Sequence, residues 1–346
     1  MIFNLNNIVR PNIKALTAYS SARDDFKGSA EVFLDANENP FPAAYNRYPG
    51  IDITNLQSNL ADLKAIETDQ LLLANGSDES IDLIIRAFCE PVINSILCFS
   101  PTYSMYKIWA EINAIAVKEV PLLPDFEWTA ALALKNLEPT TRLVFVCSPN
   151  NPTGNSVALS EIETLCKHFQ GLVIVDEAYI DFSEMPSALK LLKTCPNLIV
   201  IQTLSKAWGL AGIRIGLTMA SSEIISILNK IKPPYNISIS NAKAALKRLD
   251  NKEDFKIEVP TILKEKEILI KQLNSLKTVE KVYKSDANFL LVRFIDSFKI
   301  FNYLKTQSII VRDRSKEQGC HNCLRISVGT PQENIKLMNT LKKFEL

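Results

Sequence analysis

The sequence predicts an α/β fold with a large domain, built on a mostly parallel sheet flanked by helices, and a smaller α+β domain. Short apolar runs alternate with amphipathic, helix-like segments through the middle of the chain, and several of these runs are apolar at consecutive positions. Such runs are typical of parallel strands that are covered on both faces. The length of 346 residues agrees with two domains, because a domain averages about 150 residues.

The first 40 residues show little regular pattern, and we expect residues 1–40 to form a segment that packs on the smaller domain and on a partner subunit. Residues 41–245 are expected to form the large domain. The stretch SIDLIIRAF after Glu79 predicts a helix, because its apolar residues recur at helical spacing. The strand-like runs of this domain lie at 71–74, 95–99, 114–120, 143–147, 172–175, 198–203 and 212–220.

Residues 246–346 are expected to form the smaller domain. A charged amphipathic helix is predicted over 264–277. Strand-like runs follow at 287–294, 308–313 and 323–329. Because these strands have fewer helices between them, they favour an α+β arrangement.

Charge and hydropathy exclude several classes of protein. The chain has 39 Lys and Arg against 38 Asp and Glu, for a net charge of +1, whereas a nucleic-acid binder shows a basic excess. No apolar run approaches the roughly 18 residues of a membrane-spanning helix. The first residues also lack the apolar core of a secretory signal. We therefore expect no nucleic-acid partner and no membrane partner.

The cysteines and histidines argue against a disulfide framework and against a metal site. Seven cysteines is an odd number, and Cys98 and Cys147 lie in strand-like runs, which indicates reduced, buried thiols and a cytoplasmic location. Cys320 and Cys323 bracket His321, but the chain has no second pair of this kind and only two histidines. We therefore expect no metal. The glycine-rich loops GxGxxG and GxxxxGK[ST] are absent as well.

Polar residues follow three of the predicted strands. LVFVC runs into SPNNPTG with Asn151, LVIV runs into DEAY with Asp176 and Tyr179, and LIVIQT runs into LSK with Lys206. The carboxyl ends of parallel strands are the usual ligand-binding edge of an α/β sheet. An unpaired buried charge is costly, so this arrangement favours either a ligand that needs both an amine and an anion, or a structural ion pair between Asp176 and Lys206.

The motif NGSDE at 75–79 lies between a predicted strand and a predicted helix. The amides of Gly76 and Ser77 would then face outward from a helix N-terminus, which is a ready site for a phosphate. An ordinary N-cap formed by Ser77 explains the same residues. Ser205 and Arg214, on either side of Lys206, could add phosphate ligands, although Arg214 taken alone is equally consistent with a surface charge.

Together these motifs resemble those of a known family. SPNNPTG, VDEAY and SKAWGLAGIRIG, in this order, are similar to the fold-type-I aminotransferases that use pyridoxal 5′-phosphate. Further motifs narrow the resemblance to the histidinol-phosphate aminotransferases, over about residues 16–329. These are LDANENPF at 34–41, RYPG at 47–50, NGSDE at 75–79, SPTYSMY at 100–106, VRDRS at 311–315 and CLRISVGT at 323–330.

The resemblance implies a role for each cofactor-site residue. Lys206 would bond covalently to the cofactor aldehyde and move protons at the substrate Cα, and Asp176 would pair with the pyridinium nitrogen. Asn151 and Tyr179 would bind the ring 3′-oxygen. Tyr103 would stack on the ring, although simple core packing also explains this tyrosine. The cofactor phosphate would be held by Gly76, Ser77, Ser205 and Arg214, with Tyr48 reaching in from a partner subunit. Asp78 would also belong to the cofactor site.

The resemblance also implies a homodimer and an anion site for the substrate. Arg325 and Arg312 would bind the substrate phosphate through paired guanidiniums. Asn151 would contribute to the substrate site, and Tyr19 would close over it from the partner subunit. A solvated turn explains Arg312 and Arg314 equally well. The segment between NENPF and RYPG is shorter than is usual in the family, with Pro42 and Ala18 at positions where the family often has glycine and proline.

The implied reaction converts L-histidinol phosphate and 2-oxoglutarate into imidazole acetol phosphate and L-glutamate, a step of L-histidine biosynthesis. Two alternatives on the same scaffold are an aromatic amino-acid aminotransferase and a threonine-phosphate decarboxylase. An alternative of another class is a cofactor-binding regulator without turnover. The intact set of Lys206, Asp176 and Arg325 argues against the regulator.

Overall fold

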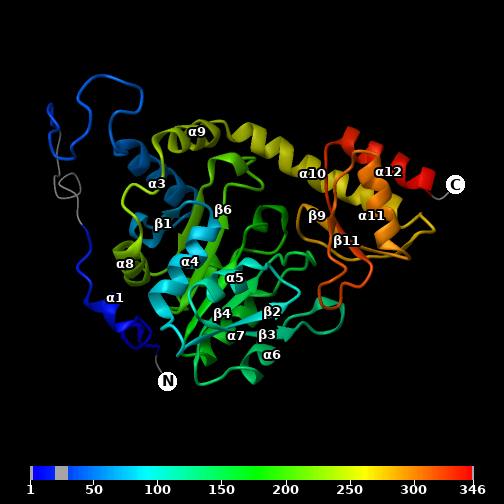
Figure 1. Cartoon of the computed structure of the whole chain (residues 1–346), viewed down its shortest axis with the longest axis horizontal. Helices are drawn as coiled ribbons and strands as arrows, with labels where there is room; N and C mark the ends of the chain where they lie inside the picture. Colours follow the sequence, from blue (N-terminus) through cyan, green and yellow to red (C-terminus); the bar gives the residue numbers. More distant parts are fainter. Residues whose placement is uncertain (1–2, 20–29, 345–346) are drawn as a thin grey trace.

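The computed structural model describes residues 3–19 and 30–344, which contain two sheets with helices around them (Figure 1). The larger sheet has seven strands in the order β1-β7-β6-β5-β4-β2-β3. Strands β2 to β6 run parallel, and β7 runs antiparallel to both of its neighbours, which confirms the predicted mostly parallel sheet. The bounds are β1 Leu71–Ala74, β2 Ser95–Ser100, β3 Ala116–Pro121, β4 Thr141–Cys147, β5 Leu172–Asp176, β6 Leu198–Thr203 and β7 Gly216–Met219.

Helices cover both faces of this sheet, because its central strands are apolar on both sides. In β5, Val173 and Val175 belong to one apolar cluster, whereas Leu172 and Ile174 belong to the other. Each fully buried side chain of this kind contributes roughly 1.5–3 kcal/mol. One face packs on α3 Ile51–Lys64, α6 Ala130–Lys135, α7 Leu159–His168 and α9 Ile239–Asp250. The other packs on α1 Pro11–Ala15, α4 Ser77–Phe88, α5 Met105–Ile112 and α8 Ser222–Ile231.

The smaller sheet is antiparallel, with the order β10-β11-β9-β8. Its strands are β8 Val279–Val282, β9 Phe289–Phe294, β10 Arg312–Asp313 and β11 Cys323–Ser327. Three helices pack on one face through a shared apolar cluster: α10 Lys252–Leu273, α11 Ser297–Thr306 and α12 Pro331–Phe344. The opposite face turns toward the larger sheet, as the shared apolar cluster of Phe126, Tyr283 and Leu291 shows.

Several predicted elements of this region differ from the structure. The charged helix begins at Lys252 and not at residue 264, and it ends at Leu273. Strand β8 was not predicted, because its sequence VEKV is short and only half-buried. The strand expected over 308–313 has only the two residues of β10, since Ser308 adopts a left-handed conformation with φ 59°. A residue with positive φ interrupts an extended strand.

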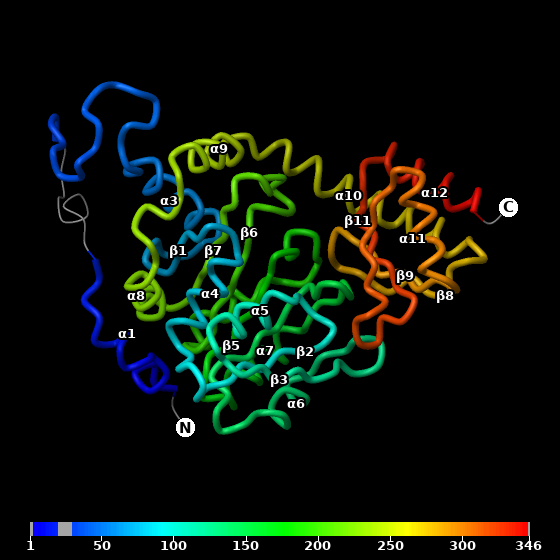
Figure 2. The backbone as a smooth tube through the Cα atoms, in the orientation of Figure 1, coloured from blue at the N-terminus to red at the C-terminus, as the bar shows by residue number. Residues whose placement is uncertain are grey.

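Residues 3–15 pack on the large sheet and not on the smaller domain, contrary to that part of the prediction for residues 1–40. Ile8, Val9 and Ile13 join the apolar cluster under α4 and α8. The Arg10 amide donates to the Ala87 carbonyl at 3.1 Å. Figure 2 shows this segment running beside α8, at the end of the molecule away from α11 and α12. These apolar side chains pack on this surface because they cover apolar residues of α4 and α8 that would otherwise be exposed.

The predicted domain boundary at residue 246 falls inside α9, which packs on α3 of the large layer. We propose that the second unit begins at α10, whose residues Leu269 and Leu273 belong to the core of the smaller sheet. Within residues 3–19 and 30–344, no helix has the length and apolar composition needed to cross a bilayer.

Candidate active site

A cavity of about 440 Å³ lies where the carboxyl ends of β4, β5 and β6 meet β10 and β11. Its volume is in the range of small-molecule sites. The side chains at the ends of parallel strands lie at one edge of the sheet, and residues of the smaller sheet form the opposite wall of the cavity. The structure brings together at this cavity the following predicted residues: Ser77, Asp78, Tyr103, Asn151, Asp176, Tyr179, Ser205, Lys206, Arg214, Arg312 and Arg325.

Lys206 and Asp176 share the cavity without a direct ion pair among the residues that the structure describes. This argues against a structural Asp176–Lys206 pair. Burial lowers the pKa of Lys206, and the nearby Arg325 guanidinium lowers it further, which favours the neutral amine. The Lys206 Nζ lies 5.5 Å from the centre of the Tyr179 ring.

Asp176 is held by two donors at the end of β5. Its Oδ1 accepts from the Ala178 amide at 3.1 Å, and its Oδ2 accepts from the Tyr106 hydroxyl at 2.7 Å. Burial raises the pKa of Asp176, and both hydrogen bonds act in the opposite direction. Tyr106 is fully buried and stacks on Phe145, with ring centres 4.7 Å apart. The sequence did not single out Tyr106, because the motif SPTYSMY does not show which distant residue its second tyrosine contacts.

Gly76 and Gly216 shape a cradle at the start of α4. Gly76 has φ 81°, and a Cβ there would lie 2.5 Å from Nη2 of Arg214. A Cβ on Gly216 would lie 2.5 Å from the Ser77 amide nitrogen, so β7 and the first turn of α4 approach each other backbone to backbone. Arg214 Nη1 donates to Ser205 Oγ at 3.3 Å. The cradle therefore joins a helix N-terminus, a hydroxyl and a guanidinium, which suits a phosphate.

Ser77 is the first residue of α4 and not its N-cap, contrary to the simpler interpretation of NGSDE. The N-cap is Gly76, which has no side chain to bind the first amides of the helix. Glu79 does not cap them either, since its Oε2 accepts from the Asn75 amide and, at 2.8 Å, from Asn236 Nδ2. The first amides of α4 are thus left for an anion.

Asp78 contacts two other predicted cofactor residues. Its Oδ1 accepts from the Tyr103 hydroxyl at 2.9 Å, and its Oδ2 lies 3.5 Å from Nη2 of Arg214. Burial raises the pKa of Tyr103, so the phenol stays protonated and donates. Asp78 therefore orients Tyr103 and Arg214 and adds a negative charge beside the cradle. Its predicted place in the cofactor site stays a prediction.

The substrate side of the cavity carries arginines. Arg312 of β10 stands directly opposite Arg325 of β11 in the antiparallel ladder, so their side chains leave the same face of the sheet. Arg325 Nη1 donates to Asn151 Oδ1, which links the two sheets. Arg314 also lines the cavity, although the sequence did not place it among the predicted site residues. Burial lowers the pKa of Arg325, and so does the Arg314 guanidinium.

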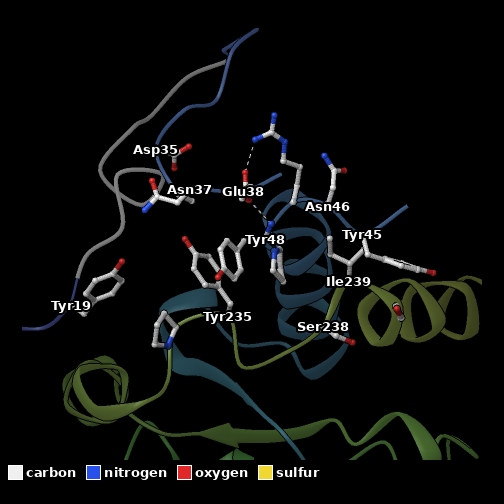
Figure 3. Close-up of a pocket in the computed structure, with 15 residues that line it drawn as sticks. Tyr19, Asp35, Asn37, Glu38, Tyr45, Asn46, Tyr48, Tyr235, Ser238 and Ile239 are labelled. Carbon is white, nitrogen blue, oxygen red and sulfur yellow. Dashed lines mark hydrogen bonds and ion pairs between the residues drawn. The ribbon is translucent and has the colours of Figure 1, made fainter. Parts of the chain in front are cut away.

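Tyr19 and Tyr48 lie away from the Lys206 cavity, beside a second pocket (Figure 3). Tyr48 stacks on Tyr235 with ring centres 4.6 Å apart, and its amide donates to Glu38 Oε1 at 2.6 Å. Tyr19 is 71% exposed. Within one chain, neither tyrosine lines the Lys206 cavity. Their predicted roles at the site of a partner subunit therefore stay predictions.

Cys320 and Cys323 are buried free thiols under the smaller sheet. Within the described part of the chain, no group of three or more His, Cys, Asp or Glu residues is arranged to hold a metal ion. The pair therefore lines the core beside Phe126 and Tyr283.

The fold and the cavity define a class of protein. A family model described as aminotransferase class I and II matches residues 29–341, and the chain belongs to this family. Within that class, the chain is 49% identical over 342 residues to a histidinol-phosphate aminotransferase from Flavobacterium psychrophilum, covering 98% of this chain and 99% of that protein.

Two solved structures confirm the fold. A histidinol-phosphate aminotransferase from Clostridium acetobutylicum has a TM-score of 0.79 and 24% identity, over 86% of this chain and 90% of that one. The enzyme from Sinorhizobium meliloti, solved in complex with pyridoxal 5′-phosphate, has a TM-score of 0.78 and 20% identity, over 86% and 84%. The predicted fold-type-I aminotransferase architecture is thereby confirmed.

Proposed function

We propose that this protein is a histidinol-phosphate aminotransferase. It uses pyridoxal 5′-phosphate to convert L-histidinol phosphate and 2-oxoglutarate into imidazole acetol phosphate and L-glutamate. The observation that carries this proposal is a single cavity that holds Lys206, Asp176 and the opposed pair Arg312 and Arg325. Such a cavity supplies an amine, a counter-charge for a basic ring, and two guanidiniums for a dianion.

The residues present fit the cofactor. Its phosphate fits the cradle, because the first turn of α4, the Ser205 hydroxyl and the Arg214 guanidinium lie together there, in an approach that only glycine at positions 76 and 216 allows. Its basic ring nitrogen fits Asp176, a buried carboxylate that has hydrogen-bond donors but no direct cationic partner in the described residues. Its aldehyde fits Lys206, whose amine has no ion-pair partner among residues 3–19 and 30–344.

Each residue then has a defined task. Ser77, Ser205 and Arg214 bind the cofactor phosphate, and Asp78 orients Arg214. Asp176, held by Tyr106, keeps the ring nitrogen protonated. When bound, the cofactor ring accepts the electrons that develop at the substrate Cα. The other ring contacts come from Tyr103, Asn151 and Tyr179.

Lys206 moves the protons. Burial and the Arg325 guanidinium lower the pKa of Lys206, which favours the neutral Nζ, and this nitrogen can take a proton from the substrate Cα and return it to a neighbouring carbon. The Tyr179 ring lies beside the amine, with its centre 5.5 Å from Nζ, and the amine stays accessible from the cavity.

Arg325 and Arg312 bind the anionic end of both substrates in turn. In one half-reaction they bind a phosphate ester, and in the other they bind the side-chain carboxylate of glutamate or 2-oxoglutarate. Asn151 fixes Arg325 through its Oδ1. The enzyme keeps the amino group after the first product leaves, and the second substrate then binds in the same site, so the reaction runs as two alternating halves with a ping-pong kinetic pattern.

We further propose a homodimer, in which Tyr48 reaches the cofactor phosphate of the partner subunit and Tyr19 closes over the substrate. This proposal is supported by the exposed side chains Leu34, Phe41 and Tyr45 on the segment that precedes α3. A cytoplasmic location agrees with seven free, buried cysteines.

The test compares three amino compounds with the purified, cofactor-loaded protein. We expect rapid glutamate formation from 2-oxoglutarate with L-histidinol phosphate and slow formation with L-phenylalanine. We expect no release of CO2 from L-threonine phosphate. Equal rates with phenylalanine would favour the aromatic aminotransferase, and CO2 release would favour the decarboxylase.

A further inference from the structure

Three arginines share one face of the smaller sheet. Arg312 and Arg314 are two positions apart on an extended segment, so both side chains leave the face from which Arg325 also projects. The ladder continues past β10, because the Arg314 amide donates to the Cys323 carbonyl at 3.0 Å. All three side chains line the cavity of Lys206. The proposed function assigns a role in substrate binding only to Arg312 and Arg325.

Arg314 is held by a carboxylate, and it is the better buried of the two arginines on this segment. Its Nη1 donates to Glu317 Oε1 in the turn after β10, and the two side chains are 14% and 28% exposed. Arg312 is an exposed residue. The turn itself is fixed, since the Glu317 amide donates to the Arg314 carbonyl at 2.9 Å. The Arg314 guanidinium is therefore in place before any ligand arrives.

The charges of this group match those of a phosphate ester. Three guanidiniums crowded into one cavity repel each other, and the Arg314 charge acts on Arg325 more strongly than the Arg312 charge does. Glu317 offsets one of the three charges from the side. The remaining charge of +2 equals in size that of a phosphate dianion and exceeds that of a carboxylate.

We propose that Arg314, positioned by Glu317, is a third guanidinium of the substrate's anion site and makes the cavity prefer a phosphate dianion to a carboxylate. A phosphate ester offers three terminal oxygens to charge-assisted donors, whereas a carboxylate offers two. Arg314 is thus a specificity-determining residue and Glu317 a positioning residue. The inference rests on the proposed function for the identity of the substrate, but the phosphate preference can be measured without turnover.

The experiment uses two variants and a control. Arg314→Gln removes the guanidinium, and Arg314→Gln combined with Glu317→Gln also removes the carboxylate, so that an amide pair can replace the ion pair in the turn. Lys299→Gln breaks the Asp296–Lys299 ion pair, which has the same three-residue spacing but lies on α11 outside the cavity. Calorimetry measures the dissociation constant of methyl phosphate for the cofactor-loaded protein, and steady-state rates give KM and kcat for histidinol phosphate and for phenylalanine.

We expect both Arg314 variants to weaken methyl phosphate binding by about 10- to 100-fold, the usual effect of one charge-assisted contact. The KM for histidinol phosphate should rise by a similar factor, while kcat and the KM for phenylalanine stay close to those of Lys299→Gln. If the double variant binds methyl phosphate as the wild type does, Arg314 only braces the turn and the proposal is wrong. If all variants bind methyl phosphate as Lys299→Gln does, the proposal is also wrong.

A wild-type protein that binds methyl phosphate but does not turn over histidinol phosphate would refute the proposed function and leave the anion site standing. The variant Arg314→Lys separates charge from geometry, because it keeps the cation but loses the planar fork. We expect it to weaken methyl phosphate less than Arg314→Gln does. An equal or larger loss would show that packing of the guanidinium, and not its charge, determines binding, and would overturn the proposed dianion preference.

Discussion

Lys206 and Lys266 have lowered pKa values but different surroundings and different tasks. Burial lowers the pKa of both Lys206 and Lys266. Lys266 Nζ donates to the carbonyls of Ser285 and Ala287, at 2.7 and 3.2 Å, so it ties α10 to the segment before β9. Lys206 lies instead at the open end of β6, in the cavity. Of the two, only Lys206 follows the end of a predicted strand of the large sheet, which is the feature that made it a candidate in the sequence.

Replacing Lys206 with Ala is expected to keep the fold and to abolish the visible absorption of the lysine-bound cofactor. Turnover should fall by a factor on the order of 10³ or more, because the group that moves the Cα proton is lost. Absorption spectra and rates of the purified variant measure both effects. Lys266→Ala is the matched control, and we expect it to lower the unfolding temperature while the absorption remains. Persistence of the absorption in Lys206→Ala would exclude Lys206 as the anchor.

Replacing Tyr106 with Phe tests how Asp176 is kept ionised. The Tyr106 hydrogen bond lowers the pKa of Asp176, so its loss raises that pKa and the carboxylate protonates at a higher pH. A hydrogen bond to a charged group is worth about 1.5–3 kcal/mol, which corresponds to roughly one to two pH units. We expect the acid limb of the kcat/KM profile to move upward by about this amount and cofactor binding to weaken.

Tyr303→Phe, on α11, serves as the control for Tyr106→Phe. An acid limb that stays in place in Tyr106→Phe would show that Tyr106 only fills the core.

Tyr106 illustrates the limit of the sequence for single side chains. A strand end identifies Asp176, but the partner 70 positions away is decided by the packing of α5 against β4 and β5.

At the level of elements, the pairing of β10 with β11 builds the substrate side of the cavity. The sequence predicted both arginine-bearing strands, but it could not predict their register. That register places Arg312 opposite Arg325, because the chain turns back between Arg314 and Cys323. A shift by one residue would move Arg312 to the helix-covered face of the sheet.

Replacing Arg312 with Ala is expected to raise the KM for histidinol phosphate about 10- to 100-fold, because one guanidinium of the opposed pair is lost. The KM for phenylalanine, which has no anionic side chain, should change little. Steady-state kinetics with both donors measure the difference. The control is Lys316→Ala, an exposed cation in the same turn. Equal losses for both donors would support an aromatic amino-acid aminotransferase instead.

At the level of the whole molecule, the cavity exists only where the two sheets meet. Arg325 and Asn151 connect them by a hydrogen bond between residues 174 positions apart. The sequence predicted the two sheets and the strand ends, since both follow from local apolar patterns. It misplaced the N-terminal segment, because the few apolar residues Ile8, Val9 and Ile13 do not indicate which of the two domains they pack against.

The proposed dimer can be tested by mixing two inactive chains. Lys206→Ala lacks the amine but keeps Tyr48, and Tyr48→Ala keeps the amine. If Tyr48 serves the partner's cavity, a mixed dimer contains one cavity with both residues intact. We expect mixtures that are unfolded and refolded together to regain up to about a quarter of the wild-type activity, the statistical share of intact cavities in a mixture of dimers. Absence of any recovery, with dimers present by light scattering, would place Tyr48 outside the partner's site.

Transfer of a labelled amino group would establish the reaction itself. The wild-type protein is incubated with L-histidinol phosphate carrying 15N at its amino group and with unlabelled 2-oxoglutarate, and the products are analysed by mass spectrometry. We expect 15N-labelled L-glutamate and imidazole acetol phosphate in equal amounts, and neither product with Lys206→Ala. Unlabelled glutamate, or 15N that remains in histidinol phosphate while phenylalanine donates its amino group readily, would contradict the proposed function.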